Sequence, residues 1–456
     1  MWMSALLEDE AELHGSDVEC RGVSIDSRTL RPGDIFVAIK GERFDGEDFV
    51  SLACSRGAAA AVVRQIHSGL DATQYLVADT LEAMTAMAAR KRQAMSAKVV
   101  AITGSSGKTS AKNMMQSVLS QAGKSFATKG NLNNHIGVPL TILNAPEDLD
   151  YLIVEAGTSG KGEIAHLAGL IDPDVALVLN VQLAHVAGFG SEEAIAREKF
   201  DLYVSGRRHP KRILNASNKR FEQFSSWFED ADAIVFSARE ELELATATVL
   251  ARKTKLDELG RPGFDLIVAN EQAQTVQLNV VGEHQVENAV AVAASAFALG
   301  VGISDIKRGL EAYAGEAGRM EAFAVSNALL VDDSYNANPG SVRAAIDYLS
   351  RREPNVLVLG DMAELGEIEQ REHVAIGKYA REKGIERLFV TGKCATDYVQ
   401  GYGDGGKIFA NKDALVAALL PLLSQKNTIL IKGSHSARMD QVVSALLEEN
   451  KKCSIG

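Results

Sequence analysis

The sequence predicts an α/β protein in which helices cover the faces of parallel sheets. Seven short apolar runs are typical of buried strands: KVVAIT, YLIVEAG, VALVLNV, NALLVDDS, NVLVLGD, RLFVTG and NTILIKGS. A polar or glycine-containing turn and then a helix-like stretch follow each run. Strands that alternate with helices favour a parallel sheet with both faces covered. At roughly 150 residues per domain, a chain of 456 residues should form about three domains.

Three blocks follow from the pattern along the chain. Residues 1–96 end in a helix-like stretch, LEAMTAMAARKRQAM, and form a small N-terminal α/β domain. Residues 97–315 open with KVVAITGSSGKTS and close after a helical stretch over 283–313, as expected of a central parallel-sheet domain. Residues 316–456 repeat the βα alternation and predict a Rossmann-like C-terminal domain. Within the central block, the short alternating runs of 221–280 predict antiparallel hairpins attached to the sheet.

Composition excludes several classes of protein. With 46% hydrophobic and 24% charged residues, the chain resembles an ordinary globular protein. The 48 basic and 60 acidic residues leave a net charge of −12, which argues against a general nucleic-acid binder. No apolar run approaches the ~20 residues that a membrane-spanning helix needs, and the acidic start MWMSALLEDEAELHG does not match a signal peptide. We therefore expect a cytoplasmic protein that contacts neither nucleic acid nor membrane.

The four cysteines are widely spaced and form no CxxC pair, so they predict neither a disulfide framework nor a zinc site. We expect reduced thiols at the following positions: Cys20, Cys54, Cys394 and Cys453.

The strongest local signal is a loop with the sequence TGSSGKTS, between the strand KVVAI and the helix-like stretch AKNMMQSVLSQAG. Backbone N–H groups of such a turn, together with the positive end of the helix, bind phosphate oxygens. Lys108 would add a mobile positive charge, and the Thr109 hydroxyl can ligate Mg²⁺. Ile102 stands where the longer GxxxxGK[ST] pattern has glycine, and a simple helix-capping turn is the alternative. The strand and helix context favours nucleoside triphosphate binding by the loop residues Gly104, Ser105, Ser106, Gly107, Lys108, Thr109 and Ser110.

Three further residues are candidates from position alone. Glu155 ends the strand YLIVE, and a carboxylate at the carboxyl end of a strand beside a phosphate loop is a typical Mg²⁺ ligand. A surface ion pair is the alternative. His185 follows the strand VALVLNV, where a ligand role and a structural role are equally open. Lys199 lies in SEEAIAREKFDLY, and taken alone it is typical of a solvated helix lysine.

Together, the motifs of the chain resemble those of the Mur ligase family, over nearly the whole length except residues 221–260. They are VSIDSRTLRPGDIFVAIKGERFDGEDF, TGSSGKTS, GNLNNHIGVPLT, YLIVEAG with GEIAHL, AHVAGFGS, GEHQVENAVAVAA, GRMEAF, DDSYNANPGSV, LGDMAELG and IKGSHSARM. The DNPR-like signature of the branch that adds a diamino acid is absent, whereas LGDMAELG is present. The combination therefore resembles the branch that joins D-alanyl-D-alanine to a UDP-N-acetylmuramoyl-tripeptide.

The resemblance implies an ATP-dependent amide ligase of cytoplasmic peptidoglycan precursor synthesis, and hence a role in cell-wall biogenesis, cell shape and cell division. ATP would phosphorylate the tripeptide carboxylate, and the dipeptide amine would displace phosphate from the acyl phosphate. The family is usually monomeric. A Mur-type ligase with another amine donor is the nearest alternative. A nucleotide-binding regulatory or transport protein is a third reading, against which the N-terminal block and the third domain argue.

The resemblance also assigns roles to residues. Lys108 would contact the outer phosphates, Thr109 and Glu155 would hold Mg²⁺, and His185 with a carbamylated Lys199 would hold a second ion. Around the nucleotide, the matching positions are Asn288 and Asn336 near adenine, Arg319 at the phosphates and Asp333 at the ribose, with Tyr335, Asn338 and Pro339 completing DDSYNANP.

The substrate positions come from the same resemblance. UDP-sugar positions are Ser27, Arg28, Thr29, Lys40, Phe44 and Asp45, and peptide-facing positions are Asn131, Asn133, Asn134, Thr158 and Ser159. The sequence departs from the family pattern at His135, at 158–161 and around Lys199. For Arg28, an ion pair with Asp26 or Asp34 is the alternative.

Overall fold

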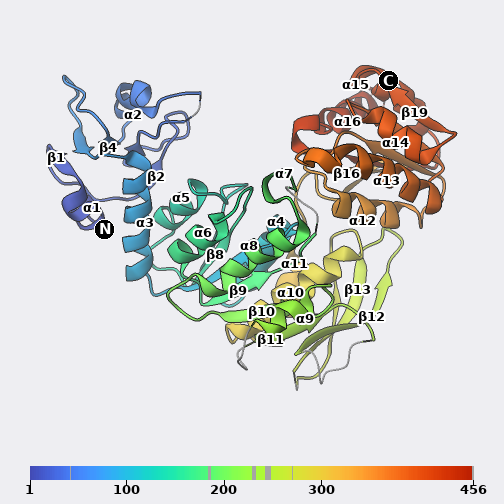
Figure 1. Cartoon of the computed structure of the whole chain (residues 1–456), viewed down its shortest axis with the longest axis horizontal. Coiled ribbons are helices and arrows are strands. Elements are labelled where there is room, and N and C mark those ends of the chain that lie inside the picture. Colours follow the sequence, from blue (N-terminus) through green and yellow to red (C-terminus); the bar gives the residue numbers. More distant parts are fainter. Residues whose placement is uncertain (42, 183–185, 228–232, 242–247, 270, 454–456) are drawn as a thin grey trace.

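The computed structural model describes residues 1–453 except 42, 183–185, 228–232, 242–247 and 270. Within these described residues the strands form three sheets, and one sheet lies in each predicted block. The N-terminal and C-terminal units stand at opposite ends of the central unit (Figure 1). All seven apolar runs that predict strands form strands, which confirms the α/β class. The domain boundaries at 96 and 315 stay predictions.

The N-terminal sheet has the order β1-β5-β4-β3-β2, with β1 antiparallel and the other neighbours parallel. Its strands are β1 (Glu12–His14), β2 (Val23–Ser24), β3 (Ile35–Val37), β4 (Ala60–Val63) and β5 (Thr73–Leu76), and its helices are α1 (Met3–Leu7), α2 (Val50–Ser55) and α3 (Thr80–Ala94), with short 3-10 turns at Glu8–Glu10 and Gly46–Phe49.

Helix α3 fastens the N-terminal unit to the central one. The buried Arg92 donates hydrogen bonds to the carbonyls of Ile171 (2.8 Å) and Asp172 (2.7 Å), where a central helix ends. Lys91 donates to the carbonyl of Leu143 (2.8 Å) at the end of another. Cations at helix C-termini satisfy carbonyls that have no partner within the helix. The two units therefore share one continuous apolar core.

The central sheet has the order β14-β13-β12-β11-β10-β9-β6-β8-β7. Its strands are β6 (Lys98–Thr103), β7 (Ser125–Ala127), β8 (Tyr151–Glu155), β9 (Val175–Val178), β10 (Lys211–Asn215), β11 (Ala233–Ser237), β12 (Val249–Leu256), β13 (Pro262–Val268) and β14 (Gln274–Gln277). Strand β13 is antiparallel to both β12 and β14, and the other described neighbours in this sheet are parallel. The prediction of hairpins for 221–280 is therefore correct for β12–β13–β14 and wrong for β11, which lies parallel to both β10 and β12.

Helices cover both faces of the central sheet because its strands alternate apolar side chains between two cores. Val99 and Ala101 of β6 face a core shared with α5 (Gly137–Leu143), α6 (Glu163–Ile171) and α8 (Glu192–Val204). Val100 and Ile102 face the opposite core, with α4 (Lys108–Leu119), α10 (His284–Ala298) and α11 (Ile303–Ala312). The predicted helical stretch over 283–313 is thus two helices, separated at Gly300, whose φ is +85°. Shorter helices are α7 (Val186–Phe189) and α9 (Phe221–Ser226).

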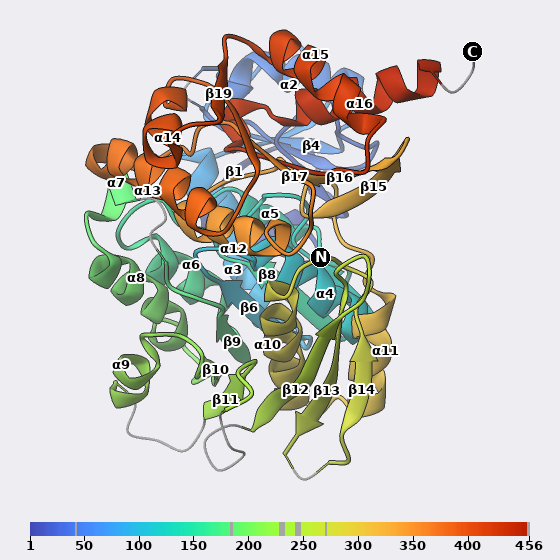
Figure 2. The ribbon, with the colours of Figure 1, turned by 90° about the vertical axis from the view of Figure 1, so that its right-hand side faces the viewer.

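The C-terminal sheet has the order β15-β16-β20-β17-β18-β19 and is parallel except for β15. Its strands are β15 (Glu321–Val325), β16 (Ala328–Asp333), β17 (Asn355–Leu359), β18 (Arg387–Thr391), β19 (Gly406–Phe409) and β20 (Thr428–Lys432); its helices are α12 (Pro339–Leu349), α13 (Glu369–Glu382), α14 (Ala395–Tyr402), α15 (Lys412–Leu423) and α16 (Asp440–Cys453), with 3-10 turns η3 (Gly366–Ile368) and η4 (His435–Ala437). Helices α12, α13 and α14 pack on one face, and α15 and α16 on the other. In Figure 2 this unit lies over the central unit, with α12 facing it.

Candidate active site

The phosphate loop connects β6 to α4, as the sequence predicts. Gly107 precedes the helix with φ +78°, a conformation that favours glycine. A Cβ at this position would lie 2.8 Å from Oδ1 of Asn288, so glycine also allows close packing of the loop on α10. Lys108 begins α4, and its Nζ donates to the carbonyl of Gly104 (2.9 Å). Burial lowers the pKa of Lys108, although the carboxylate of Glu155 opposes the shift.

A pocket of about 520 Å³ lies between the phosphate loop and the C-terminal unit. Most of the predicted nucleotide and peptide residues line it. They are Ser105, Ser106, Gly107, Lys108, Thr109, Ser110, Asn131, Asn133, Asn134, Glu155, Thr158, Ser159, Asn288, Arg319, Asp333, Tyr335, Asn336 and Asn338. The tertiary structure therefore assembles one site from positions that are more than 200 residues apart in the chain.

Glu155 and Thr109 provide two oxygen donors at this pocket. Oε1 of Glu155 accepts a hydrogen bond from Nδ2 of Asn133 (2.7 Å). Oε2 of Glu155 is buried and has no hydrogen-bond partner among the described residues. Burying a carboxylate oxygen without a hydrogen-bond partner costs free energy. Binding a hard divalent cation would give this oxygen a partner. The residues present thus fit Mg²⁺, with Thr109 as a second oxygen donor.

Arg319, at the start of the C-terminal unit, contacts the hydroxyl of Thr109. Its Nη2 donates to Oγ1 of Thr109 (3.2 Å), and its guanidinium stacks on the ring of Tyr335, 4.0 Å from the centroid. A guanidinium held by an aromatic face keeps one orientation. Arg319 is therefore aimed at the position where the outer phosphates of a nucleotide on the loop would lie.

Lys199 is buried on α8, which contradicts the solvated lysine that the local sequence favours. Burial lowers its pKa well below the usual value, and the positive charge of Lys108 lowers the pKa further. Its neighbour Glu198 is also buried, and that carboxylate accepts the N–H groups of Gly162 (2.7 Å) and Ile164 (2.7 Å) at the start of α6. His185 lies outside the described residues.

The predicted UDP-sugar residues form a separate group in the N-terminal unit and do not line the pocket. The guanidinium of Arg28 pairs with the carboxylate of Asp26 (2.7 Å), which is the alternative that the sequence left open. The carboxylate of Asp45 forms an ion pair with the guanidinium of Arg64 (2.5 Å), and the backbone of Asp45 lies antiparallel to that of Lys40 in a single β-bridge. Ser27 is buried, whereas Thr29 and Phe44 are exposed. Their role in binding UDP-sugar stays a prediction.

Sequence reasoning missed several residues that line the pocket. Lys432 is buried at the end of β20, and its Nζ pairs with Oδ2 of Asp333 (2.6 Å) and donates to the carbonyl of Asn336 (2.8 Å). Asn180 and Gln182 follow β9 and contact the loop. Glu364 lines the pocket with φ +62°, a backbone strain that often marks functional loops. The position of Lys432 and Asn180 just at or after a parallel strand is the signal that could have found them.

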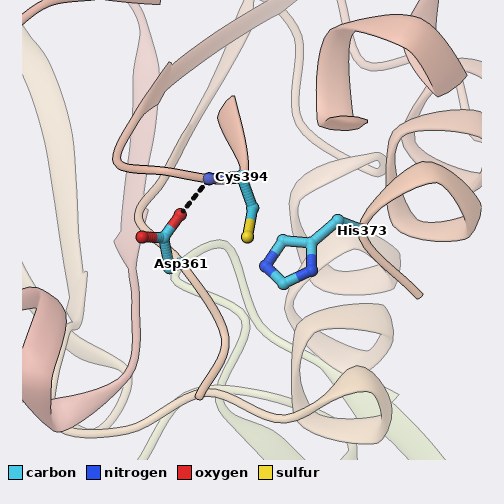
Figure 3. Close-up of side chains that lie close together, drawn as sticks. All are labelled: Asp361, His373 and Cys394. Carbon is cyan, nitrogen blue, oxygen red and sulfur yellow. Dashed lines mark hydrogen bonds between the residues drawn. The ribbon is translucent and has the colours of Figure 1, made fainter. Parts of the chain in front are cut away.

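A second cluster lies in the C-terminal unit, where ligand-type atoms of Asp361, His373 and Cys394 lie within 4.8 Å of one another (Figure 3). Asp361 accepts the N–H groups of Lys393 (3.0 Å) and Cys394 (3.0 Å) just before α14. Nε2 of His373 accepts the N–H of Met362 (3.1 Å), so its lone pair is already used. Burial raises the pKa of Cys394 to about 12. We therefore interpret this cluster as the anchor of the loop that carries Glu364.

Three family models match consecutive parts of the chain. The Mur ligase family catalytic domain matches residues 19–104, the Mur ligase middle domain 102–296, and the Mur ligase glutamate ligase domain 318–435. The three matches follow one another in the order of the N-terminal, central and C-terminal units. The chain therefore belongs to the Mur ligase family.

The branch of the family follows from individual relatives. The UDP-N-acetylmuramoyl-tripeptide–D-alanyl-D-alanine ligase of Escherichia coli is 39% identical and covers 97% of both chains. The ligase of that name from Bacillus subtilis is 31% identical over 94% of this chain and 93% of its own. A crystal structure of MurF from Acinetobacter baumannii superposes with a TM-score of 0.88, at 30% identity over 98% of each chain. MurF from Thermotoga maritima in complex with ADP gives 0.82, at 27% identity over 95% of this chain and 98% of that chain. Within the family, this chain groups with the MurF ligases.

Across the described part of the chain, no helix combines the length and apolar character needed to cross a bilayer.

Proposed function

We propose that this protein joins D-alanyl-D-alanine to UDP-N-acetylmuramoyl-tripeptide at the expense of ATP, as a monomeric cytoplasmic enzyme of peptidoglycan precursor synthesis. The observation that carries the proposal is the shared pocket, in which the phosphate loop and Glu155 face Arg319 and Asp333 of the C-terminal unit. Relatives that bear this activity in their names match the chain nearly end to end.

The reaction needs an activated carboxylate, because an amine does not displace oxide from a carboxylate. The tripeptide carboxylate attacks the γ-phosphorus of ATP, the bond to the ADP oxygen breaks, and an acyl phosphate forms. The dipeptide amine then attacks the acyl carbon and loses a proton, phosphate leaves, and the amide remains. Both partners of the first step are anions, so the site must neutralise charge and align the reacting groups.

The residues of the chain divide this work between the two walls of the pocket. Loop N–H groups and Lys108 would bind the phosphates from the central unit, and Arg319, which contacts Thr109, would approach them from the C-terminal unit. Asp333 would accept hydrogen bonds from the ribose, and Asn288 and Asn336 would border the adenine. The tripeptide would lie along Asn131, Asn133, Asn134, Thr158 and Ser159, which also line the pocket. The UDP moiety would bind the N-terminal unit through its predicted residues.

Thr109 and Glu155 would hold Mg²⁺, which lowers the negative charge of the transferring phosphoryl group when it is bound. A second ion would bind His185 and a carbamate on Lys199, as the family resemblance implies. The lowered pKa of Lys199 supports this assignment, because the neutral amine is the form that adds to CO₂ and releases a proton.

The decisive experiment measures ADP release and ligation product with each substrate left out in turn. We expect both products only when ATP, the UDP-muramoyl tripeptide and D-alanyl-D-alanine are all present. A regulatory nucleotide-binding protein would release ADP without either co-substrate, and that result would refute the proposal. Tripeptides with diaminopimelate or lysine at the third position would identify the acceptor.

Donor specificity gives a second expected result. D-alanyl-D-alanine should be used at least a hundredfold better than free D-alanine, because a site built for the dipeptide leaves polar groups unpaired when a single amino acid binds. Competition assays of kcat/KM with both donors measure the ratio. Equal use of the two donors would instead favour a Mur-type ligase with another specificity.

Movement of the C-terminal unit gives a third expected result. The nucleotide contacts are split between the central and C-terminal units, which are connected by a linker where Gly315 (φ +85°) and Gly318 (φ +72°) flank Glu316 and Ala317. We expect the C-terminal unit to close when an ATP analogue and the UDP-substrate bind, and the radius of gyration to fall. Small-angle scattering with and without both ligands tests this, and superimposable profiles would contradict it.

A further inference from the structure

Asn180 follows β9 and directs its polar groups at two residues of the phosphate loop. Its Oδ1 accepts the backbone N–H groups of Ser105 (3.1 Å) and Ser106 (3.0 Å), and also the Ser106 hydroxyl (3.3 Å). Its Nδ2 donates back to the carbonyl of Ser106 (3.2 Å). Its own carbonyl accepts the Ser105 N–H as well (3.1 Å). One side chain thus closes a reciprocal set of hydrogen bonds around a single turn of the loop.

These bonds decide which loop amides face a nucleotide. The N–H groups of Ser105 and Ser106 point to Asn180, so the cradle for phosphate oxygens begins at Gly107 and continues into the first turn of α4. The N-terminus of a helix is where amide groups and the helix dipole bind phosphate together. Asn180 therefore sets the boundary between loop amides used for structure and amides left for the ligand.

The loop needs such support because its composition does not hold a shape by itself. It contains Gly104 and Gly107, which lose much conformational freedom on ordering. On its far side it is contacted by the C-terminal unit, where Nδ2 of Asn338 lies 3.4 Å from the carbonyl of Ser105. Ordering a binding loop before the ligand arrives removes that cost from the binding free energy.

We infer that Asn180 is a positioning residue for the nucleotide: it holds the phosphate loop in its binding shape before ATP arrives. The inference rests on the proposed function only in taking the loop as the nucleotide site.

The test uses ADP binding to the full-length protein, measured by calorimetry. Asn180→Ala removes the side-chain hydrogen bonds, and Asn180→Leu removes them while keeping the branched shape of the side chain. We expect both to weaken ADP binding at least tenfold. Asn144→Ala is a matched control, because the Asn144 amide makes an equivalent reciprocal pair with the backbone of Val23 (3.1 and 2.9 Å) at the junction of the first two units. This variant should lose stability and bind ADP within twofold of the wild type.

Steady-state kinetics separate positioning from a purely structural role. In the Asn180 variants KM for ATP should rise, while kcat at saturating ATP and KM for the dipeptide stay within about threefold of wild type. The reason is that a disordered loop weakens the binding of ATP equally in the ground state and in the transition state. ADP affinity within twofold of wild type in the Asn180 variants, or a fall in kcat alone, would overturn the inference. Absence of ADP binding by the wild type would instead refute the nucleotide site itself.

Discussion

Replacing Lys108 by alanine should reduce ligation at least a hundredfold and leave the fold intact. Lys108 lines the pocket at the first residue of α4, and its Nζ bonds only to the carbonyl of Gly104 among the described residues. When that contact is lost, water in the pocket can donate a hydrogen bond to the carbonyl of Gly104, so the free energy of unfolding should change little. A cation that contacts the transferring phosphoryl group stabilises the transition state by roughly 3 kcal/mol or more, which corresponds to a hundredfold or greater in rate.

Lys124→Ala is the control for this experiment. Lys124 is exposed in the connection between α4 and β7, where it pairs with Asp148, and it does not line the pocket. Product formation should be unchanged in this variant. Lys124 is far from the phosphates, and the loss of an exposed ion pair changes the stability of the fold little. Circular dichroism and thermal unfolding check that the Lys108→Ala protein is folded. Near-normal ligation by a folded Lys108→Ala protein would refute the assignment of the phosphate loop.

Lys199→Ala should lose most of the activity, and a short carboxylate such as acetate should restore part of it. A free ammonium at Lys199 would be repelled by Lys108 and by bound cations, whereas a carbamate offers two oxygens that a hard cation prefers. Glu198 cannot substitute, because its carboxylate already caps α6 through the N–H groups of Gly162 and Ile164. Acetate in the cavity left by the lysine would supply the missing anionic oxygens.

Arg197→Ala is the control on the same helix. Arg197 is exposed, and its guanidinium lies over Trp227 rather than in the pocket. The Arg197→Ala protein should catalyse ligation at the wild-type rate, and acetate should not change that rate, as in the wild type. A crystal grown with bicarbonate and ATP should show extra density on Lys199. A bare amine there, or a fully active alanine variant, would contradict carbamylation.

Much of the fold could be predicted from local patterns in the sequence. Apolar runs such as KVVAIT and VALVLNV form strands because they are short, rich in valine and isoleucine, and apolar on both faces, as a strand inside a covered sheet requires. The sequence TGSSGKTS predicts a turn between strand and helix, since glycine at 107 permits the left-handed conformation that precedes α4. The prediction for 221–280 was partly wrong, because an alternating run is compatible with either strand direction and the neighbour decides.

The site depended on distant contacts to a larger extent. Local sequence placed Lys199 on a solvated helix, but α8 packs on the central sheet and buries it. The contact of Arg319 with Thr109 spans 210 residues and exists only because the C-terminal unit folds back over the loop. The burial of a single polar side chain and its proximity to distant residues depend on packing between elements, so the local sequence around that residue does not reveal them.

The sequence by itself determined which elements form, where nucleotide phosphates would bind and, through its ordered motifs, the family. The tertiary structure alone decided which of the polar residues meet. It left Oε2 of Glu155 without a described partner, turned Asn180 onto the phosphate loop, and kept Arg28 and Phe44 away from the pocket. The physical reason is that strand and helix formation depend on near neighbours in the chain, whereas a catalytic pocket depends on how whole sheets and helices are packed against one another.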